Sequence, residues 1–309
     1  MKLFYYQRCD QKPNFGDELN HWLWPQLSAD LLDTDDSVVF LGTGTLLNDK
    51  LPGRVTTTDR LVIFGTGAGY ESPLGAIPKS WDIHCVRGPL SARQLGLPEE
   101  RAIADGGLLV ARLRSPKTQR SGCSFMPHIH HANEACEQWQ QICQQANIRY
   151  IDPRWPVEEV LEAIGSSDRL LAEAMHGAIA ADALRVPWIP IVTGPRIYRF
   201  KWQDWCASMN LFYHPYRLPA LKPYKRWGRG LRSGQIALKH WLGAALEGPI
   251  SMPQYELLDD QSAIARRLAN IAKQAPTLSD EAIFSQRVEQ LHSCFSQLCK
   301  QYLREPIMH

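Results

Sequence analysis

The residues best suited to chemistry lie where a short apolar strand gives way to a helix. Residues 169–172 are predicted to form the strand, Glu173 and His176 follow it, and small residues from Gly177 onward favour a helix. In open parallel sheets this carboxyl edge is where ligands bind, and a helix start offers free N–H groups to an anion. A lone histidine at a helix start is also often a cap or a satisfied core residue. Both roles stay open for His176, and the segment predicts a substrate that carries phosphate or carboxylate.

Two Gly-Thr-Gly turns, at residues 42–44 and 65–67, each follow an apolar strand. Glycine lets the backbone approach a ligand closely, so Gly44 and Gly67 are candidate substrate-binding positions. The pattern is not G-x-G-x-x-G, and no acidic residue stands about 20 positions further on to hold a ribose. Tight turns that line a cleft are therefore favoured over a dinucleotide site.

Three histidines, His128, His130 and His131, follow another predicted strand. On an extended segment His128 and His130 could share a face, as metal ligands often do. No cysteine or acidic partner stands at a recognisable ligand spacing, so we expect no metal and no cofactor. We expect instead a polar group at a strand end, in which His128 binds an anion or moves a proton.

Several charged residues also follow predicted strands or open helices. Arg87 offers a planar fork suited to phosphate or carboxylate, although it could be a surface arginine. Arg199 and Lys201 lie in a predicted basic loop, which is either a solvated face or an anion-binding site. Asp17 lies at the start of a predicted helix. Its side chain could cap the N-terminus of that helix or take part in catalysis.

The composition limits the class of protein. A chain of 309 residues is long enough for two domains. The apolar fraction of 44% and the charged fraction of 21% are typical of a soluble globular protein, and a net charge of +2 does not indicate a nucleic-acid partner. The eight cysteines form no C-x-x-C pair, which argues against a zinc ribbon. With no recognisable signal peptide or membrane span, we expect a cytoplasmic protein with reduced thiols.

Strand and helix signals alternate along the first two thirds of the chain. This pattern predicts an α/β fold with parallel sheets flanked by helices. We expect one Rossmann-like domain over residues 1–115 and a second over residues 116–200, facing each other across a cleft as in the GT-B class. Residues 201–309 are predicted to form a basic and aromatic segment and then a helical extension, since apolar residues recur at helix spacing from about residue 261.

Residues 205–246 contain seven Lys or Arg and no Asp or Glu, with Trp and Tyr interleaved. A solvated basic loop is one interpretation, and a nucleic-acid face lacks a fold to support it. Peripheral contact with the inner face of the membrane is another, because each basic residue near an anionic leaflet contributes ~1 kcal/mol and aromatic rings suit the headgroup region. The predicted contact residues are Arg217, Lys222, Lys225, Arg226, Arg229 and Arg232.

An ordered set of short motifs extends over about residues 1–200. The motifs are Asn14-Phe15-Gly16-Asp17, the two glycine turns, Val86-Arg87-Gly88-Pro89-Leu90-Ser91, Asp105 after Ile103-Ala104, Pro127-His128, and Met175-His176-Gly177-Ala178-Ile179. With this set the chain resembles the polysaccharide pyruvyl transferase family, and in particular its succinoglycan-biosynthesis-like branch.

The resemblance implies a GT-B-type fold and an enzyme that transfers an enolpyruvyl group. The donor would be phosphoenolpyruvate, and the acceptor a sugar of a polysaccharide or of its lipid-linked precursor, on which a pyruvate ketal forms. By position, the resemblance implies a catalytic histidine at His176, an acidic residue at Asp17 beside Asn14, and a motif arginine at Arg87.

One departure from the family pattern concerns the donor phosphate. Many members have Arg-Leu-His where this chain has Ala174-Met175-His176. Other cations must then hold the phosphate, and Arg87, Arg199 and Lys201 are the candidates.

The implied reaction adds a sugar hydroxyl to C2 of the enol. It needs a proton at C3, removal of a proton from oxygen, and cations on the leaving phosphate, but no metal. Trp22, Trp24 or Tyr70 could stack on the acceptor ring.

Two other functions stay open, namely a GT-B glycosyltransferase whose nucleotide-sugar ribose binds Glu173, and a non-catalytic sugar- or phosphate-binding protein.

Overall fold

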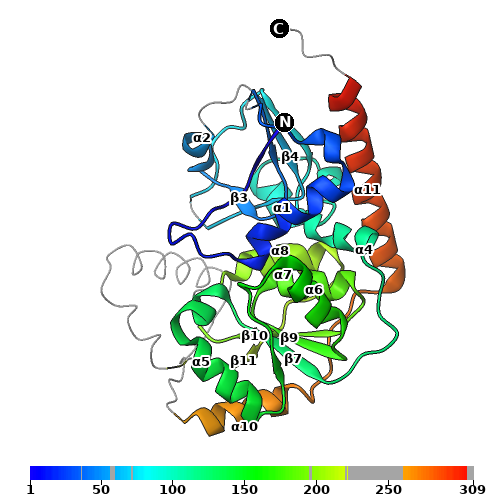
Figure 1. Ribbon diagram of the computed structural model, residues 1–309. Helices are drawn as coiled ribbons and strands as arrows, with labels where there is room; N and C mark the ends of the chain where they lie inside the picture. Colours follow the sequence, from blue (N-terminus) through cyan, green and yellow to red (C-terminus); the bar gives the residue numbers. More distant parts are fainter. Residues whose placement is uncertain are drawn as a thin grey trace.

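Two parallel β-sheets organise the chain, one formed by its first third and the other by the middle of the sequence (Figure 1). The computed structural model describes residues 1–35, 37–55, 60–70, 72–194, 197–219, 221 and 260–304. The strands of the first sheet are, in order, β1 (Lys2–Phe4), β2 (Val38–Leu41), β4 (Arg60–Phe64) and β6 (Trp81–Cys85). A separate short parallel pair, β3 (Thr45–Leu47) and β5 (Gly67–Ala68), extends the turns that follow β2 and β4.

The second sheet has five parallel strands. In order across the sheet they are β11 (Tyr216–Arg217), β10 (Trp188–Val192), β9 (Arg169–Ala172), β7 (Cys123–Met126) and β8 (Arg149–Tyr150). The central strand β9 is apolar and buried, as expected for a strand covered on both faces. The predicted α/β class with parallel sheets and flanking helices is confirmed, whereas the predicted domain boundaries stay a prediction.

Helices connect the strands and cover the sheets. In the first part of the chain they are α1 (Phe15–Leu27), α2 (Leu51–Arg54), α3 (Pro89–Gln94) and α4 (Val110–Leu113), with 3₁₀ turns η1 (Ala29–Leu31), η2 (Glu99–Arg101) and η3 (Gly106–Leu109). In the second part they are α5 (Ile129–Gln145), α6 (Val157–Gly165), α7 (Met175–Ala183) and α8 (Arg199–Ser208). Two more follow, α10 (Gln261–Ile271) and α11 (Glu281–Arg304).

Three local predictions were wrong. The apolar residues 102–104 predict a last strand of the first domain, but they form none and contribute only a single bridge between Ala102 and Val86. His130 and His131 belong to the first turn of α5 rather than to an extended segment, because His128 caps that helix. The basic stretch from Arg199 is the helix α8 and not a loop.

The predicted helical pattern near residue 261 is confirmed. Asp260 caps α10, since its Oδ1 accepts hydrogen bonds from Ser262 N at 2.9 Å and Ala263 N at 3.1 Å. The apolar positions Ile264 and Leu268 are fully buried on one face of that helix.

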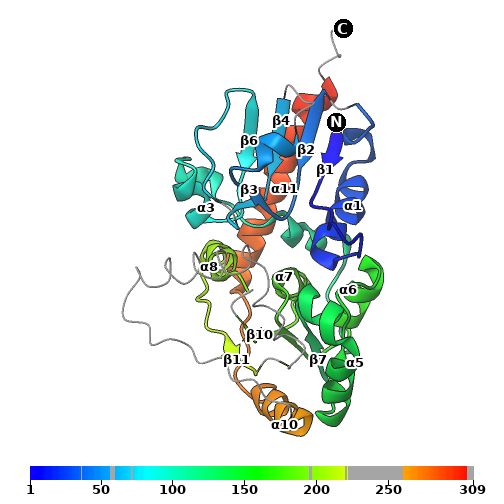
Figure 2. The same cartoon turned by 90° about the vertical axis from the view of Figure 1, so that its left-hand side faces the viewer.

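Helix α11 returns to the first sheet and completes its core (Figure 2). The ring centroid of Phe295 lies 5.5 Å from that of Trp24 and 5.4 Å from that of Phe64. Near its start, α11 contacts the second part of the chain, where Arg185 Nε lies 3.1 Å from Glu281 Oε2. Trp24 has no exposed surface, whereas Trp22 and Tyr70, the other two residues that could stack on an acceptor ring, are partly exposed.

Among the described helices, none has the length and the apolar character needed to cross a membrane.

Candidate active site

His176 lies in the first turn of α7, just beyond the carboxyl end of β9, as the sequence predicts. The neighbouring Gly177 lets the helix pack against the sheet, because a Cβ atom there would lie 2.6 Å from Met126 Sδ. The imidazole packs against the first turn of α1, where a Cβ atom on Gly16 would lie 2.1 Å from His176 Nδ1. Two elements that are far apart in sequence therefore enclose the ring.

A buried carboxylate faces this imidazole. Asp105 Oδ2 lies 3.7 Å from His176 Nε2, and the Asp105 side chain has no exposed surface. Its other oxygen, Oδ1, accepts a 2.9 Å hydrogen bond from Gly107 N at the start of η3. Within the described residues neither Asp105 Oδ2 nor His176 Nε2 has a hydrogen-bond partner. This arrangement suits a histidine that gains a proton, because the carboxylate then stabilises the imidazolium.

Asp105 was not among the predicted site residues, although the sequence carries a signal for it. The apolar pair before Asp105 and the two glycines after it repeat the pattern of the other turns at strand ends. The turns pack closely together, because a Cβ atom on Gly65, where φ is +74°, would lie 2.5 Å from Gly106 N. A carboxylate at such a turn is thereby directed toward the same edge as His176.

Asp17 occupies the first turn of α1, and Asn14 is the residue that caps this helix. The Asn14 side-chain Nδ2 donates a 2.7 Å hydrogen bond to Asp17 Oδ2. Burial raises the pKa of Asp17 to about 6, although this hydrogen bond and the positive charges of His176 and Lys201 lower it. Since Asp17 does not cap the helix, the competing structural role is not supported, and the carboxylate is suited to exchange a proton near neutral pH.

Lys201 and Arg8 bring positive charge to the same region. The charges of both side chains act on Asp17 and on His128, which lie on different elements. Burial, together with the charges of His130 and Lys201, lowers the pKa of His128 well below its ordinary value. His128 is therefore neutral at physiological pH. The predicted residues Asp17, His128, His176 and Lys201 share one electrostatic environment, and we call them the catalytic cluster. Arg8, on the loop before α1, was not singled out in the sequence.

The position of Lys201 is fixed by Tyr70. Lys201 is 8% exposed, and its Nζ donates a 2.7 Å hydrogen bond to Tyr70 Oη. Tyr70 has a positive φ of 70° and stacks on Tyr198 with ring centroids 4.8 Å apart. The amino group of Lys201 thus remains at the edge of the cluster, although most of its side chain is buried.

Arg87 is fully buried. Its Nε lies 3.0 Å from Asp204 Oδ2, and its Nη1 and Nη2 donate to Gly44 O, Thr45 Oγ1 and Ala68 O. Arg87 has no exposed surface in this structure through which it could contact a substrate. A substrate contact by Arg87 therefore stays a prediction. Gly67 serves this packing, since a Cβ atom there would lie 2.2 Å from the Arg87 guanidinium carbon.

Glu173 is also fully buried, and protein groups surround its carboxylate. Oε2 lies 2.6 Å from His131 Nδ1 and accepts a 2.9 Å hydrogen bond from His128 N, while Oε1 accepts one of 3.2 Å from Thr193 N. Burial alone would raise the pKa of Glu173, but the interactions with His131, His128 and Thr193 hold it below its ordinary value. The carboxylate therefore joins β7, β9 and β10, and a substrate contact by Glu173 stays a prediction.

The remaining predicted residues are less closely tied to the cluster. Arg199 is exposed at the start of α8, and Arg217 is exposed in β11. In the described part of the chain, no group of three or more His, Cys, Asp or Glu side chains is arranged to hold a metal ion. The other residues of the predicted membrane contact lie outside the described residues: Lys222, Lys225, Arg226, Arg229 and Arg232.

Comparison with known proteins agrees with the family resemblance that the ordered motifs indicate. Residues 2–195 match the model of the family described as polysaccharide pyruvyl transferase. The chain is also 33% identical to the succinoglycan biosynthesis protein ExoV of Rhizobium meliloti (strain 1021), over 322 aligned positions that cover 98% of this chain and 100% of that protein. The family match includes Asp17, Asp105 and His176 and ends before Lys201. The chain therefore belongs to the polysaccharide pyruvyl transferase family, as its motifs predict, and is a transferase of pyruvyl groups in polysaccharide biosynthesis.

Proposed function

We propose that this transferase uses phosphoenolpyruvate as its donor and forms a pyruvate ketal on a sugar of a polysaccharide or of its lipid-linked precursor. The observation that carries the proposal is the pairing of His176 with the buried Asp105, next to Asp17, whose pKa is raised to about 6. The pair lies at the start of a helix, where backbone N–H groups favour an anion. This combination supplies proton transfer and anion binding within one site.

The proton transfers can be assigned to these side chains. Protonated His176 donates a proton to C3 of the enol, which becomes a methyl carbon, while a sugar hydroxyl adds to C2 and gives its proton to Asp17. A second hydroxyl then bonds to C2, the bond between C2 and the phosphate oxygen breaks, and the phosphate leaves with the proton of that hydroxyl. Asp105 acts as a positioning residue, because its carboxylate orients His176 and stabilises the protonated ring.

The phosphate and carboxylate of the donor need positive partners in place of the arginine missing at Ala174. Lys201 is the leading candidate, since its charge reaches Asp17 and His128. The charge of Arg8 reaches them too, but its guanidinium is already paired with Asp10, with Nη2 2.8 Å from Oδ2. Arg199 is a further candidate, because it is exposed at the start of α8, the helix that also carries Lys201. The proposal needs no cofactor.

The arrangement of the two sheets supports a GT-B-like enzyme whose site lies between two halves. Asp17 and Asp105 come from the amino-terminal half, and His176 and His128 from the half that contains the second sheet. A cytoplasmic location at the inner face of the membrane would suit a lipid-linked acceptor. Sedimentation with anionic and neutral vesicles would test that part of the proposal separately.

The direct experiment incubates the purified protein with phosphoenolpyruvate and an oligosaccharide from the source strain's polysaccharide, stripped of its ketals by mild acid. We expect release of inorganic phosphate and a mass gain of one ketal-linked pyruvate, both absent with His176→Ala. Nucleotide sugars as donors are the control. Sugar transfer from a nucleotide sugar, without phosphate release from phosphoenolpyruvate, would refute the proposal.

A further inference from the structure

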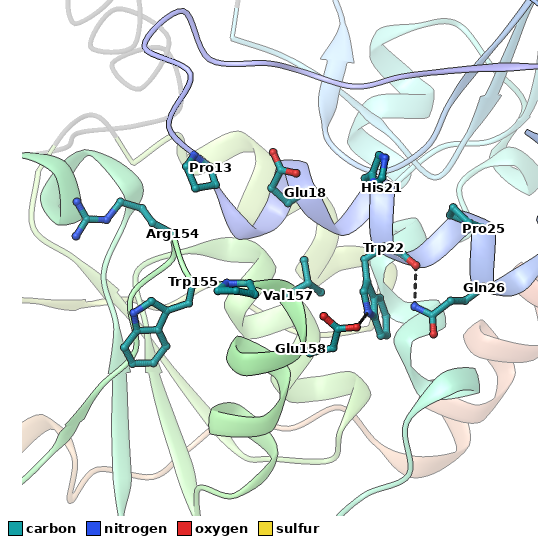
Figure 3. Close-up of a pocket in the computed structure, with 11 residues that line it drawn as sticks. Pro13, Glu18, His21, Trp22, Pro25, Gln26, Arg154, Trp155, Val157 and Glu158 are labelled. Carbon is teal, nitrogen blue, oxygen red and sulfur yellow. Dashed lines mark hydrogen bonds between the residues drawn. The ribbon is translucent and has the colours of Figure 1, made fainter. Parts of the chain in front are cut away.

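A groove runs along helix α1 beside the proposed base (Figure 3). It lies between α1 and residues 154–158, which lead into α6, and its volume is about 590 Å³. This is within the range of ~300–1,000 Å³ that is common for small-molecule sites. Asp17 is one helical turn from His21, which lines the groove, so the two side chains share a face of α1. Asp17 itself does not line the groove, but the groove extends along the helix that carries it and includes the neighbouring Glu18.

The walls of the groove combine aromatic rings with hydrogen-bonding groups. Trp22 and Gln26 line it from α1, and Trp155 and Glu158 line it from the facing segment (Figure 3). Trp22 Nε1 donates a 2.9 Å hydrogen bond to Glu158 Oε1, and the Arg114 guanidinium carbon lies 5.7 Å from the centre of the Trp22 ring. These contacts fix the orientation of the ring before any ligand arrives, which reduces the cost of binding.

The charge of the groove argues against an anionic occupant. Glu18 and Glu158 contribute two carboxylates to its lining. The guanidinium of Arg154 is held by Asp152, with Nε 2.8 Å from Oδ1 and Nη2 2.5 Å from Oδ2. Carboxylates repel a phosphate but accept hydrogen bonds from hydroxyl groups. The lining therefore suits a neutral, hydroxyl-rich chain with an apolar ring face.

We infer that this groove binds the acceptor glycan, with its sugar residues extending along α1 from the catalytic cluster. The inference rests on the proposed function for the position of the reacting hydroxyl. The groove would select the acceptor by its neutral sugars, while the cations near Lys201 select the donor.

Calorimetry with the acid-treated oligosaccharide, in the absence of phosphoenolpyruvate, tests the inference. Trp155→Ala should weaken oligosaccharide binding about 10-fold or more, and Gln26→Ala should weaken it by a smaller factor. Trp155→Phe, which keeps a ring, should retain most of the affinity. Phe212→Ala is the matched control, because Phe212 is an aromatic residue, 82% exposed, outside the groove. In turnover assays the KM for phosphoenolpyruvate should stay unchanged in all four variants.

Three results would overturn the inference. The first is that the wild-type protein does not bind the oligosaccharide, and the second is that wild type and a folded Trp155→Ala variant bind it with equal affinity. The third is that Tyr70→Ala, and not Trp155→Ala, loses affinity for the oligosaccharide, which would place the acceptor on the other side of the catalytic cluster. Groove-dependent binding without turnover of phosphoenolpyruvate would instead contradict the proposed function and support the groove as a glycan site.

Discussion

His176 Nδ1 fills the space in which a side chain at position 16 would begin, since a Cβ atom on Gly16 would lie only 2.1 Å from it. This contact joins the first turn of α1, which carries Asp17, to the first turn of α7. The two proposed proton-transfer groups are thus neighbours because residue 16 has no side chain.

Replacing Gly16 with alanine should therefore displace the imidazole. We expect kcat to fall about 100-fold, because a displacement near 1 Å in an active site has that scale of effect. Gly53→Ala is the matched control, since no heavy atom lies within 4 Å of a Cβ atom there. Steady-state kinetics and circular dichroism on both variants would check this, and a folded Gly16→Ala enzyme of normal kcat would contradict it.

His176→Ala should lower kcat about 100-fold or more, the usual scale for a lost proton-transfer group. Donor binding should weaken much less, because the cations and the start of α7 remain. Single-turnover kinetics and a donor titration would separate the two effects. The role proposed for His176 is wrong if a folded variant keeps near-normal turnover.

Asp105→Asn should act through His176 and not through the substrates. The neutral amide no longer stabilises the protonated imidazole, so we expect kcat to fall about 10-fold while both KM values change little. A purely structural role would lower the melting temperature and leave the kcat of the folded variant unchanged.

The acid limb of the pH–kcat profile should report Asp17. Because burial raises the pKa of Asp17 to about 6, the base becomes protonated and kcat falls as the pH drops below that value. Asn14→Ala removes a hydrogen bond that lowers this pKa, so the limb should move to higher pH. A limb in the same place in both proteins would exclude Asp17 as the group that titrates.

Arg87→Ala decides between a structural role and a role in donor binding. The buried pair with Asp204 predicts a loss of about 3–5 kcal/mol in the free energy of unfolding, because one charge is left buried without its partner. Chemical denaturation would measure this. Unchanged stability combined with weaker donor binding would support the role that the sequence suggested.

Much of the framework could be predicted because the strands are short apolar runs that end at turns. The observed bounds of β9 are the predicted ones, and Asp17, His128 and His176 do share one electrostatic environment. Parallel strands end at a common edge, so groups that follow them in sequence meet in space.

The burial of individual charges could not be predicted, because it depends on partners distant in sequence. Arg87 and Lys201 are both cations next to predicted strands, yet Arg87 pairs with Asp204, 117 positions away, and has no exposed surface, whereas Lys201 Nζ donates to Tyr70 Oη. Glu173 likewise meets His131, 42 positions away, which no local pattern indicates.

The packing of α11 has a consequence for synthesis on the ribosome. The residues of the catalytic cluster all precede α11, but Phe295, which completes the aromatic core around Trp24, belongs to that last described helix. Until α11 emerges, the nascent chain displays an incomplete aromatic core to chaperones and to other chains. A premature stop codon before α11 would therefore be expected to yield an aggregation-prone product rather than a shorter enzyme with reduced activity.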